Sequence, residues 1–130
     1  MTARISVILD ANAIIYACLQ HIDLENAIPS SLGAYTIFVP GSVTEELSRL
    51  GEKSPDARLA LAYSRKFKSI RTTLPGDDGV MEAASTPGSV IVTSDRELIR
   101  RTRGLGIGIL TIRGGRTLDM IRAPITSVRT

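Results

Sequence analysis

The chain has 130 residues, of which 43% are hydrophobic, and this length suits one buried core rather than two. Aromatic residues make up only 4% and tryptophan is absent, which argues against an aromatic platform for stacking bases. Because Cys18 is the only cysteine, an internal disulfide and a cysteine-based zinc site are excluded, and a reducing, cytoplasmic setting is expected. The four residues before the first apolar run are too few for a signal sequence or a membrane span, so no membrane association is expected.

Charge is distributed unevenly along the chain, although the net charge is only +3. Residues 1–50 contain five acids and two arginines, whereas residues 96–130 contain eight arginines and two acids. Electrostatic fields act within a Debye length, about 8 Å at physiological salt, so the local distribution matters more than the sum. An acidic centre beside a basic surface suits phosphodiester chemistry.

The first half of the chain alternates apolar runs with helical patterns. Its first run ends in Asp10, which is typical of a buried parallel strand that carries a polar residue at its carboxyl end. Ser54 followed by Pro55 is a strong helix start. We expect strands over residues 5–9 and 36–39, and helices over residues 11–19, 23–32, 42–50 and 54–67.

The second half continues this alternation. Its most convincing strand follows Pro87 and Gly88, which end the helix before it. We expect strands near residue 70 and over residues 90–93 and 107–112, and helices over residues 77–84 and 95–103. Beyond residue 115, a helical stretch is expected over residues 118–121, followed by irregular chain.

This order of elements predicts an α/β protein. The expected architecture is a three-layer α/β/α sandwich with a central, mostly parallel sheet of about four or five strands and right-handed crossovers. The main domain is expected over residues 1–115, with residues 116–130 as a tail that packs on it or trails from it. Ligands of such sheets bind beyond the carboxyl ends of the strands, so a functional site is expected along that edge.

Four acidic residues are predicted to share this edge. Asp10 and Asp95 follow two of the strongest strands almost at once, and Glu46 and Asp78 lie in the first turns of helices that border it. If the four carboxylates converge, their repulsion raises some of their pKa values unless a cation neutralises them. Oxygen ligands without cysteine or histidine favour Mg²⁺ or Mn²⁺ over zinc. Such an ion polarises phosphorus and generates hydroxide from bound water.

Helix capping is a simpler explanation for acids at helix starts. Glu45 has the spacing of a capping box, which leaves Glu46 free, and Asp77 is the natural cap of its helix, which leaves Asp78 free. Asp10 is harder to explain in this way. An acid at the end of a buried strand is costly to desolvate unless hydrogen bonds, a cation or water compensate it.

Four segments, taken together, resemble the PIN domain family of nucleases. They are, in family order, residues 10–12, 43–47, 76–81 and 92–98. The first resembles an Asp-x-Asn signature, the second the helix with the family's glutamate, and the last a Thr-x-Asp motif. In the third segment Asp78 is favoured over Asp77 as the family's third acid. The resemblance extends over nearly the whole chain, from residue 5 to about residue 112.

The resemblance implies an α/β/α fold and Mg²⁺- or Mn²⁺-dependent cleavage of single-stranded RNA by a metal-activated water, which leaves a 5′-phosphate. The catalytic and metal-binding residues that it implies are Asp10, Glu46, Asp78 and Asp95, supported by hydrogen bonds from Asn12 and Thr93. Residues 95–101 look more like the branch with ribosomal-RNA-processing nucleases than like VapC-type toxins.

The helix predicted after Asp95 carries arginines at helical spacing. These side chains suit binding to an RNA backbone, and the alternative is a solvated outer face of the helix. The candidate RNA-binding residues are Arg96, Arg100, Arg101 and Arg103.

Three functions remain open at this stage. An active endoribonuclease, in RNA processing or as a toxin, is favoured because all four acids are present. The alternative is a catalytically inactive RNA-binding or assembly module with the same fold. A phosphorelay receiver is less favoured, since the first strand ends in a single acid and no lysine follows the last strands. The expected partners are single-stranded or structured RNA, a second copy of the chain, and an antitoxin or a ribosome-assembly partner.

Overall fold

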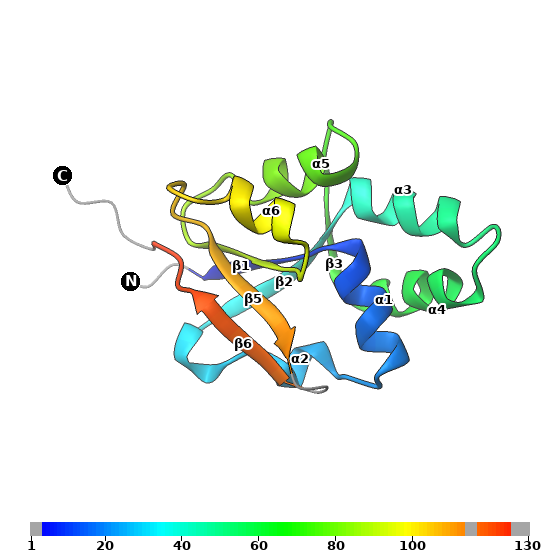
Figure 1. The fold of residues 1–130 in the computed structure, drawn as a ribbon, viewed down its shortest axis with the longest axis horizontal. Helices are drawn as coiled ribbons and strands as arrows, with labels where there is room; N and C mark the ends of the chain where they lie inside the picture. The colour runs from blue at the N-terminus through cyan, green and yellow to red at the C-terminus, as the bar shows by residue number, and fades with distance from the viewer. Residues whose placement is uncertain (1–3, 114–116, 126–130) are drawn as a thin grey trace.

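The computed structural model describes residues 4–113 and 117–125 (Figure 1). Within these residues, six strands form one sheet in the order β3-β2-β1-β4-β5-β6. Neighbouring strands are parallel except β5 and β6, which are antiparallel. The strands are β1 (Ile5–Leu9), β2 (Tyr35–Pro40), β3 (Lys68–Ile70), β4 (Ser89–Val92), β5 (Gly108–Arg113) and β6 (Thr117–Arg122).

Helices cover both faces of this sheet. β2 and β3 lie on one side of β1 while β4 and β5 lie on the other, so right-handed crossovers place the helices of the two halves on opposite faces. Figure 1 shows α1 next to α4, and α5 next to α3. The helices are α1 (Ala11–Leu19), α2 (Leu24–Ala27), α3 (Gly41–Leu50), α4 (Pro55–Ser64), α5 (Gly76–Ala83) and α6 (Arg96–Arg101). None of these described helices is long and apolar enough to cross a membrane.

The predicted α/β/α fold is therefore confirmed, with six strands in the described sheet instead of four or five. Its centre is aliphatic: Ile8 and Leu9 have no exposed surface, as expected for a parallel strand covered on both faces. Leu9 lies opposite Val92 in the register of β1 and β4. Asp10 and Thr93, the residues that follow them, therefore emerge side by side at the carboxyl edge of the sheet.

Local signals account for several helix boundaries. The side chain of Ser54 accepts a hydrogen bond from the backbone N–H of Ala57 (3.2 Å), and Pro55 takes the first helical position, so α4 begins as predicted. The single helix expected over residues 23–32 is wrong. α2 ends at Ala27, and a separate 3₁₀ turn follows Pro29, because proline lacks the N–H that a continuous helix needs.

The helix expected over residues 118–121 is also wrong, because these residues belong to β6. Leu118 is buried whereas Thr117 and Asp119 are exposed, which is the alternation of a strand with one covered face. The alternation of buried and exposed side chains therefore indicates a strand, although the segment was expected to be helical. β6 pairs with β5 and extends the sheet, so residues 117–122 are an edge strand of the domain rather than a trailing segment.

Candidate functional site

One hydroxyl group joins the carboxyl ends of β1 and β4. Thr93 Oγ1 donates a hydrogen bond to Asp10 Oδ2 (2.7 Å) and accepts one from the backbone N–H of Asp95 (3.0 Å). The backbone N–H of Asp10 donates to the carbonyl of Val92 (3.2 Å), so the pairing of the two strands continues to this point. Thr93 therefore links the side chain of Asp10 to the backbone of Asp95 at the edge of the sheet.

Asp10 is a buried carboxylate, only 5% exposed, and it forms no ion pair within the described residues. It precedes α1, but its side chain makes no capping hydrogen bond. Burial raises the pKa of Asp10 from 3.8 to about 6, the hydrogen bond from Thr93 opposes this rise, and the negative charges of Asp77 and Glu46 add to it. Helix capping therefore does not explain an acid at this position, and a buried charge without a cation costs free energy.

Asp95 combines a structural bond with an available oxygen. Its Oδ1 atom accepts hydrogen bonds from the backbone N–H groups of Glu97 (2.9 Å) and Leu98 (3.3 Å), which caps α6. No hydrogen bond within the described chain involves its Oδ2 atom. The residue also lines a cavity of about 270 Å³ together with Asn12 and Tyr16. The cap fixes the carboxylate while leaving it accessible to a ligand.

The two acids in the first turn of α5 have different surroundings. Asp78, which the sequence favoured, forms an exposed ion pair with Arg101 of α6 (2.6 Å). Asp77 is partly buried; burial raises its pKa, the negative charge of Asp95 adds to the rise, and Arg101 opposes it. Asp77 also contributes to the raised pKa of Asp10. The charge of Asp77 thus acts on the acids at the strand ends, whereas Asp78 is paired with Arg101 at the surface.

The capping predicted for Asp77 at the start of α5 and for Glu45 at the start of α3 is not observed. Pro75 occupies the N-cap position and α5 begins at Gly76, so Asp77 lies inside the first turn and is not the cap. The capping box expected at the start of α3 is not formed either. Pro40 precedes that helix, and the buried Oγ of Ser42 has no hydrogen-bond partner within the described residues.

α3, which carries Glu46, is closely packed against α5, and the negative charge of Glu46 adds to the raised pKa of Asp10. Thr72 Oγ1 accepts a hydrogen bond from the backbone N–H of Ser42 (3.0 Å), which ties the loop before α5 to the start of α3. A Cβ atom at Gly79 would collide with Ser42 Oγ and with the carbonyl oxygen of Leu74. Glycine at this position therefore permits the close approach of α5 to α3.

Glu82 holds the loop that leads into α5. Its carboxylate accepts hydrogen bonds from the backbone N–H groups of Thr73 (2.8 Å) and Leu74 (3.0 Å) and from the Thr73 hydroxyl (3.0 Å). The backbone N–H groups of Leu74 and Thr73 hold the pKa of Glu82 below its usual value of 4.5. Glu82 is therefore a positioning residue for the turn that carries Asp77. Sequence spacing gave no signal for it, because its partners lie in an irregular loop.

Asn12 lies outside the hydrogen-bond network of the acids. Its side chain is exposed on α1 and makes no hydrogen bond within the described residues, in contrast to Thr93. It lines the cavity beside Asp95 instead. The structure therefore places Asn12 where a ligand can reach its amide group.

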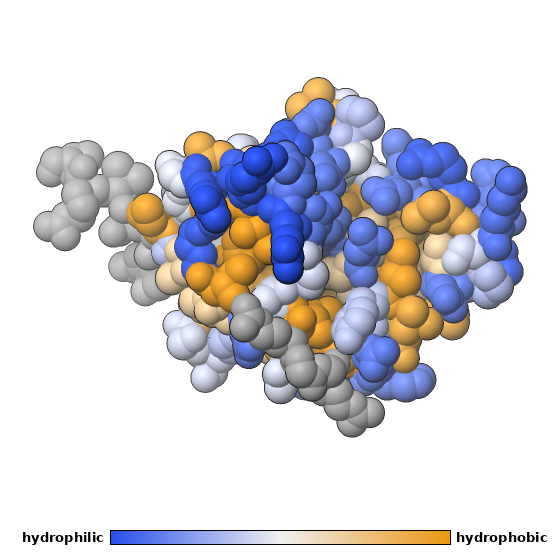
Figure 2. Space-filling model, viewed as in Figure 1, coloured by the Kyte–Doolittle hydropathy of each residue, from blue (hydrophilic) through white to orange (hydrophobic). Residues whose placement is uncertain are grey.

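The arginines on α6 and just after it, which we call the α6 arginines, are all exposed: Arg96, Arg100, Arg101 and Arg103. Arg100 pairs with Glu97 and Arg101 with Asp78, whereas Arg96 and Arg103 form no ion pair within the described chain. Figure 2 shows hydrophilic side chains gathered over α5 and α6, next to more hydrophobic parts of the same face. Because α6 begins directly after Asp95, unpaired cations extend from the acidic strand end over the outer surface.

The ligand chemistry of this edge suits a hard divalent cation, since the charged side chains of Asp10, Asp77 and Asp95 are carboxylates. Among residues 4–113 and 117–125, no three acidic, histidine or cysteine side chains are gathered closely enough to hold a metal ion. Mg²⁺ commonly binds to one or two carboxylates and keeps several waters, so it does not require a closed set of protein ligands.

Residues 7–115 match the family model described as a PIN like domain. The chain belongs to the PIN-like domain family. This match spans all four motif segments from which the resemblance was predicted, from Asp10 to Asp95. Membership of this family also argues against a phosphorelay receiver.

Relatives of this PIN-like protein carry nuclease names. It is 30% identical over 110 residues to Ribonuclease VapC9 of Archaeoglobus fulgidus, an alignment that covers 79% of this chain and 81% of the relative. The solved structure of the PIN domain endonuclease Utp24 has a TM-score of 0.76 and 27% identity, over 95% of this chain and 96% of that one. A domain of a functionally unknown protein from Methanocaldococcus jannaschii, with a TM-score of 0.55 and 14% identity over 98% and 100% of the two chains, shares the fold.

Proposed function

We propose that this PIN-like protein is an endoribonuclease that hydrolyses single-stranded RNA with Mg²⁺ or Mn²⁺. The observation that carries the proposal is Asp10, a buried carboxylate without an ion-pair partner among the described residues, whose pKa is raised by burial and by two neighbouring acids. Such a group is costly to maintain unless a cation binds to it. Similarity to a ribonuclease and to an endonuclease supports phosphodiester hydrolysis as the reaction.

The proposed centre is the acidic edge, which we define as Asp10, Glu46, Asp77 and Asp95. Asp77 takes the place predicted for Asp78, because the charge of Asp77 acts on the strand-end acids while Asp78 is paired with Arg101. The side chains that would hold a cation, directly or through water, are Asp10 and Asp77, with Asp95 and Glu46 completing the pocket.

A bound divalent cation would supply polarisation of the phosphate and a water of lowered pKa. The chain itself orients the acids: Thr93 fixes the carboxylate of Asp10 by a hydrogen bond, and the α6 cap fixes that of Asp95. His21, the single histidine of the chain, is exposed at the end of α1, so the acidic edge operates without a histidine base. The proposed nucleophile is water, and the expected product carries a 5′-phosphate.

A cleavage assay on single-stranded RNA tests this proposal. The wild-type protein is expected to cut the RNA with Mn²⁺ or Mg²⁺, and both EDTA and Asp10→Asn are expected to abolish cutting. Asp56→Asn, an exposed acid in the first turn of α4, is the matched control and should retain activity. Undiminished cleavage by Asp10→Asn would refute the site. RNA binding without cleavage across substrates and metals would instead identify a catalytically inactive binding module.

The cellular role that we propose is RNA processing or toxin activity in the cytoplasm. A toxin is expected to be isolated from its host with a tightly bound small antitoxin that blocks cleavage. A processing enzyme is expected to be isolated without such an inhibitor, or with a ribosome-assembly partner, and to cut structured precursor RNA at defined positions. Size-exclusion chromatography of the purified chain tests the proposed homodimer.

A further inference from the structure

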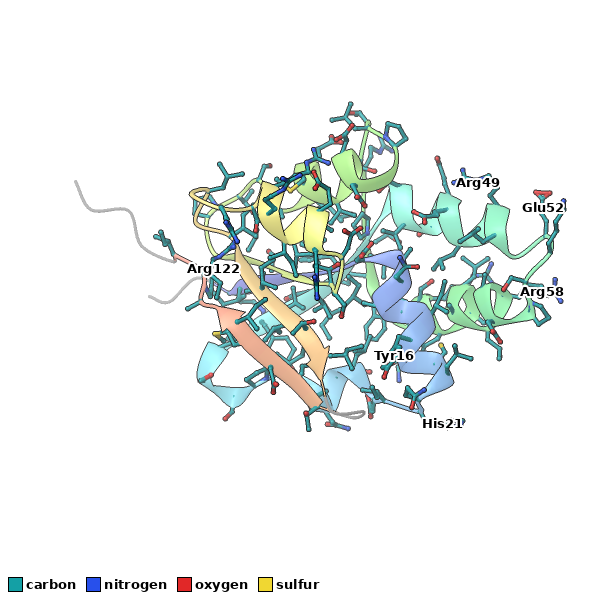
Figure 3. All side chains as sticks on the ribbon, in the orientation of Figure 1. Tyr16, His21, Arg49, Glu52, Arg58 and Arg122 are labelled. Carbon is teal, nitrogen blue, oxygen red and sulfur yellow. The ribbon has the colours of Figure 1, made fainter. Side chains whose placement is uncertain are left out.

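A cavity of about 270 Å³ opens beside the acidic edge, and the proposed hydrolysis does not account for its lining. It lies between α1, the loop after β4 and the end of β5. Its six lining residues are Asn12, Ala13, Tyr16, Ser94, Asp95 and Ile112. Figure 3 shows Tyr16 projecting from α1 near the end of β5.

The lining combines a ring, aliphatic surface and a free amide. The side chain of Tyr16 is 42% exposed although it is large and apolar, so its ring is available for contact. Asn12 makes no hydrogen bond within the described residues, and its amide therefore offers both donors and an acceptor. Ser94 is already fixed, because its Oγ atom is hydrogen-bonded to Thr111 Oγ1 (2.9 Å).

Charge limits what this cavity can bind. None of its lining residues is cationic and Asp95 is acidic, so a phosphate group is disfavoured inside it. Pockets for drug-sized ligands range from about 300 to 1,000 Å³, so this smaller volume suits a single ring system. A flat, neutral ring with hydrogen-bonding groups on its edge fits both the apolar walls and the amide.

We propose that this cavity binds one unpaired nucleobase of the RNA substrate, which stacks on Tyr16 and hydrogen-bonds to Asn12. The inference rests on the proposed ribonuclease function, which supplies the class of ligand. Stacking on an aromatic ring tolerates every base, whereas hydrogen bonds to an amide discriminate between base edges. Tyr16 is thus assigned to affinity and Asn12 to base preference.

The position of the cavity gives the bound base a defined relation to the reaction. Asp95 belongs both to the cavity and to the acidic edge, and Thr93 links it to Asp10. A base in the cavity therefore places its own backbone next to the acids. A base within a duplex cannot enter without being unpaired and unstacked, so the cavity also accounts for a preference for single strands.

The first test measures RNA binding in EDTA, where no cleavage occurs, with a short fluorescein-labelled single-stranded RNA. Tyr16→Ala is expected to weaken binding by about fivefold to a hundredfold, the usual loss for one stacked base. Tyr16→Phe and Tyr16→Trp should bind nearly as well as wild type, because they keep the ring. Leu19→Ala is the matched control: it is on the same helix, 48% exposed and outside the cavity, and should change nothing. Wild-type affinity of Tyr16→Ala would overturn the proposal, as would an equal loss in Tyr16→Phe.

The second test removes the base instead of the ring. RNAs with one abasic position, scanned along the strand, are expected to show one position where affinity falls as much as in Tyr16→Ala. At that position the two changes should not add, since each removes the same contact. Additive losses at every position would contradict the stacking contact.

Failure of the inference can be separated from failure of the proposed function. If Asp10→Asn loses cleavage with Mn²⁺ while Tyr16→Ala has the same KM as wild type, the proposed nuclease activity stands and the proposed base site is refuted. If the protein never cleaves RNA but binds it in a way that depends on Tyr16, the proposed base site stands and the proposed nuclease activity is refuted. If both hold, Tyr16→Ala raises KM with little change in kcat, and Asn12→Ala alters the preferred base next to the cut.

Discussion

The acidic edge and the α6 arginines meet at Asp95, which caps α6, but the two regions are built in different ways. Asp10 is buried and fixed by Thr93, and Asp95 is fixed by backbone N–H groups. Arg96 at the start of α6 and Arg103 just after its end are exposed side chains without ion-pair partners among the described residues. The carboxylates of the acidic edge are therefore held in fixed positions without a cation beside Asp10. The arginine side chains carry positive charge, but few contacts hold them in place.

This difference predicts two kinds of mutational effect. Groups held in fixed positions act together, so the loss of one member of the acidic edge is expected to be severe and insensitive to salt. Exposed cations act on an RNA backbone through screened electrostatics, so their loss is expected to be graded and to depend on ionic strength.

The largest loss of cleavage is expected when Asp77, rather than its neighbour Asp78, is replaced. Asp77→Asn should reduce cleavage by more than about a hundredfold, since even outer partners of metal ligands commonly cost 10–100-fold. Asp78→Asn should have a much smaller effect, because Asp78 is engaged with Arg101 at the surface. The two isosteric variants are controls for each other in the same cleavage assay. A larger loss of cleavage in Asp78→Asn than in Asp77→Asn would instead assign Asp78 to the acidic edge.

A smaller, salt-dependent effect is expected for the α6 arginines. The double variant Arg96→Gln/Arg103→Gln should weaken binding of single-stranded RNA and lower the slope of log affinity against log salt by about 0.7 per lost phosphate contact. Arg49→Gln/Arg65→Gln removes the same charge from exposed positions on α3 and beside α4. An equal loss in this control would show a general effect of net charge. An unchanged salt slope in the α6 variant would remove these arginines from the RNA interface.

The smallest effect is expected for stability, at Glu82. Because the pKa of Glu82 is lowered in the folded state, its contribution to stability is present above the unfolded value of 4.5 and is lost as the pH falls through the lowered pKa. Glu82→Gln should therefore lower Tm at pH 7, and the difference from wild type should shrink below pH 4.5. Glu52→Gln, an exposed acid between α3 and α4, should not show this pH dependence. A difference that persists at low pH would show that the loop clamp does not depend on the charge.

Much of the fold follows from local sequence patterns. The apolar runs before Asp10 and Asp95 predict buried parallel strands, and the strand register then places Thr93 beside Asp10 without further information. Ser54 and Pro55 predict the start of α4 because a cap involves residues close in sequence. The short segment of β6 does not by itself predict a strand, because the pairing with β5 that stabilises it involves residues outside the segment.

The details of the site depend on contacts between distant segments. The different surroundings of Asp77 and Asp78 arise from Arg101, which is more than twenty positions away in the chain. The clamp by Glu82 depends on an irregular loop, and the cavity at Tyr16 depends on the end of β5. Sequence spacing identifies which acids reach the edge of the sheet, but packing decides which neighbour faces inward.

The most direct measurement of the central claim is calorimetric titration of Mn²⁺ into the wild-type protein and into Asp10→Asn, Asp77→Asn and Asp78→Asn. If the acidic edge holds the cation, wild type and Asp78→Asn bind Mn²⁺ saturably, and Asp10→Asn and Asp77→Asn lose this binding while remaining folded by circular dichroism. Mn²⁺ binding that is undiminished in folded Asp10→Asn, or that is absent from a wild-type protein active in EDTA, would contradict the account.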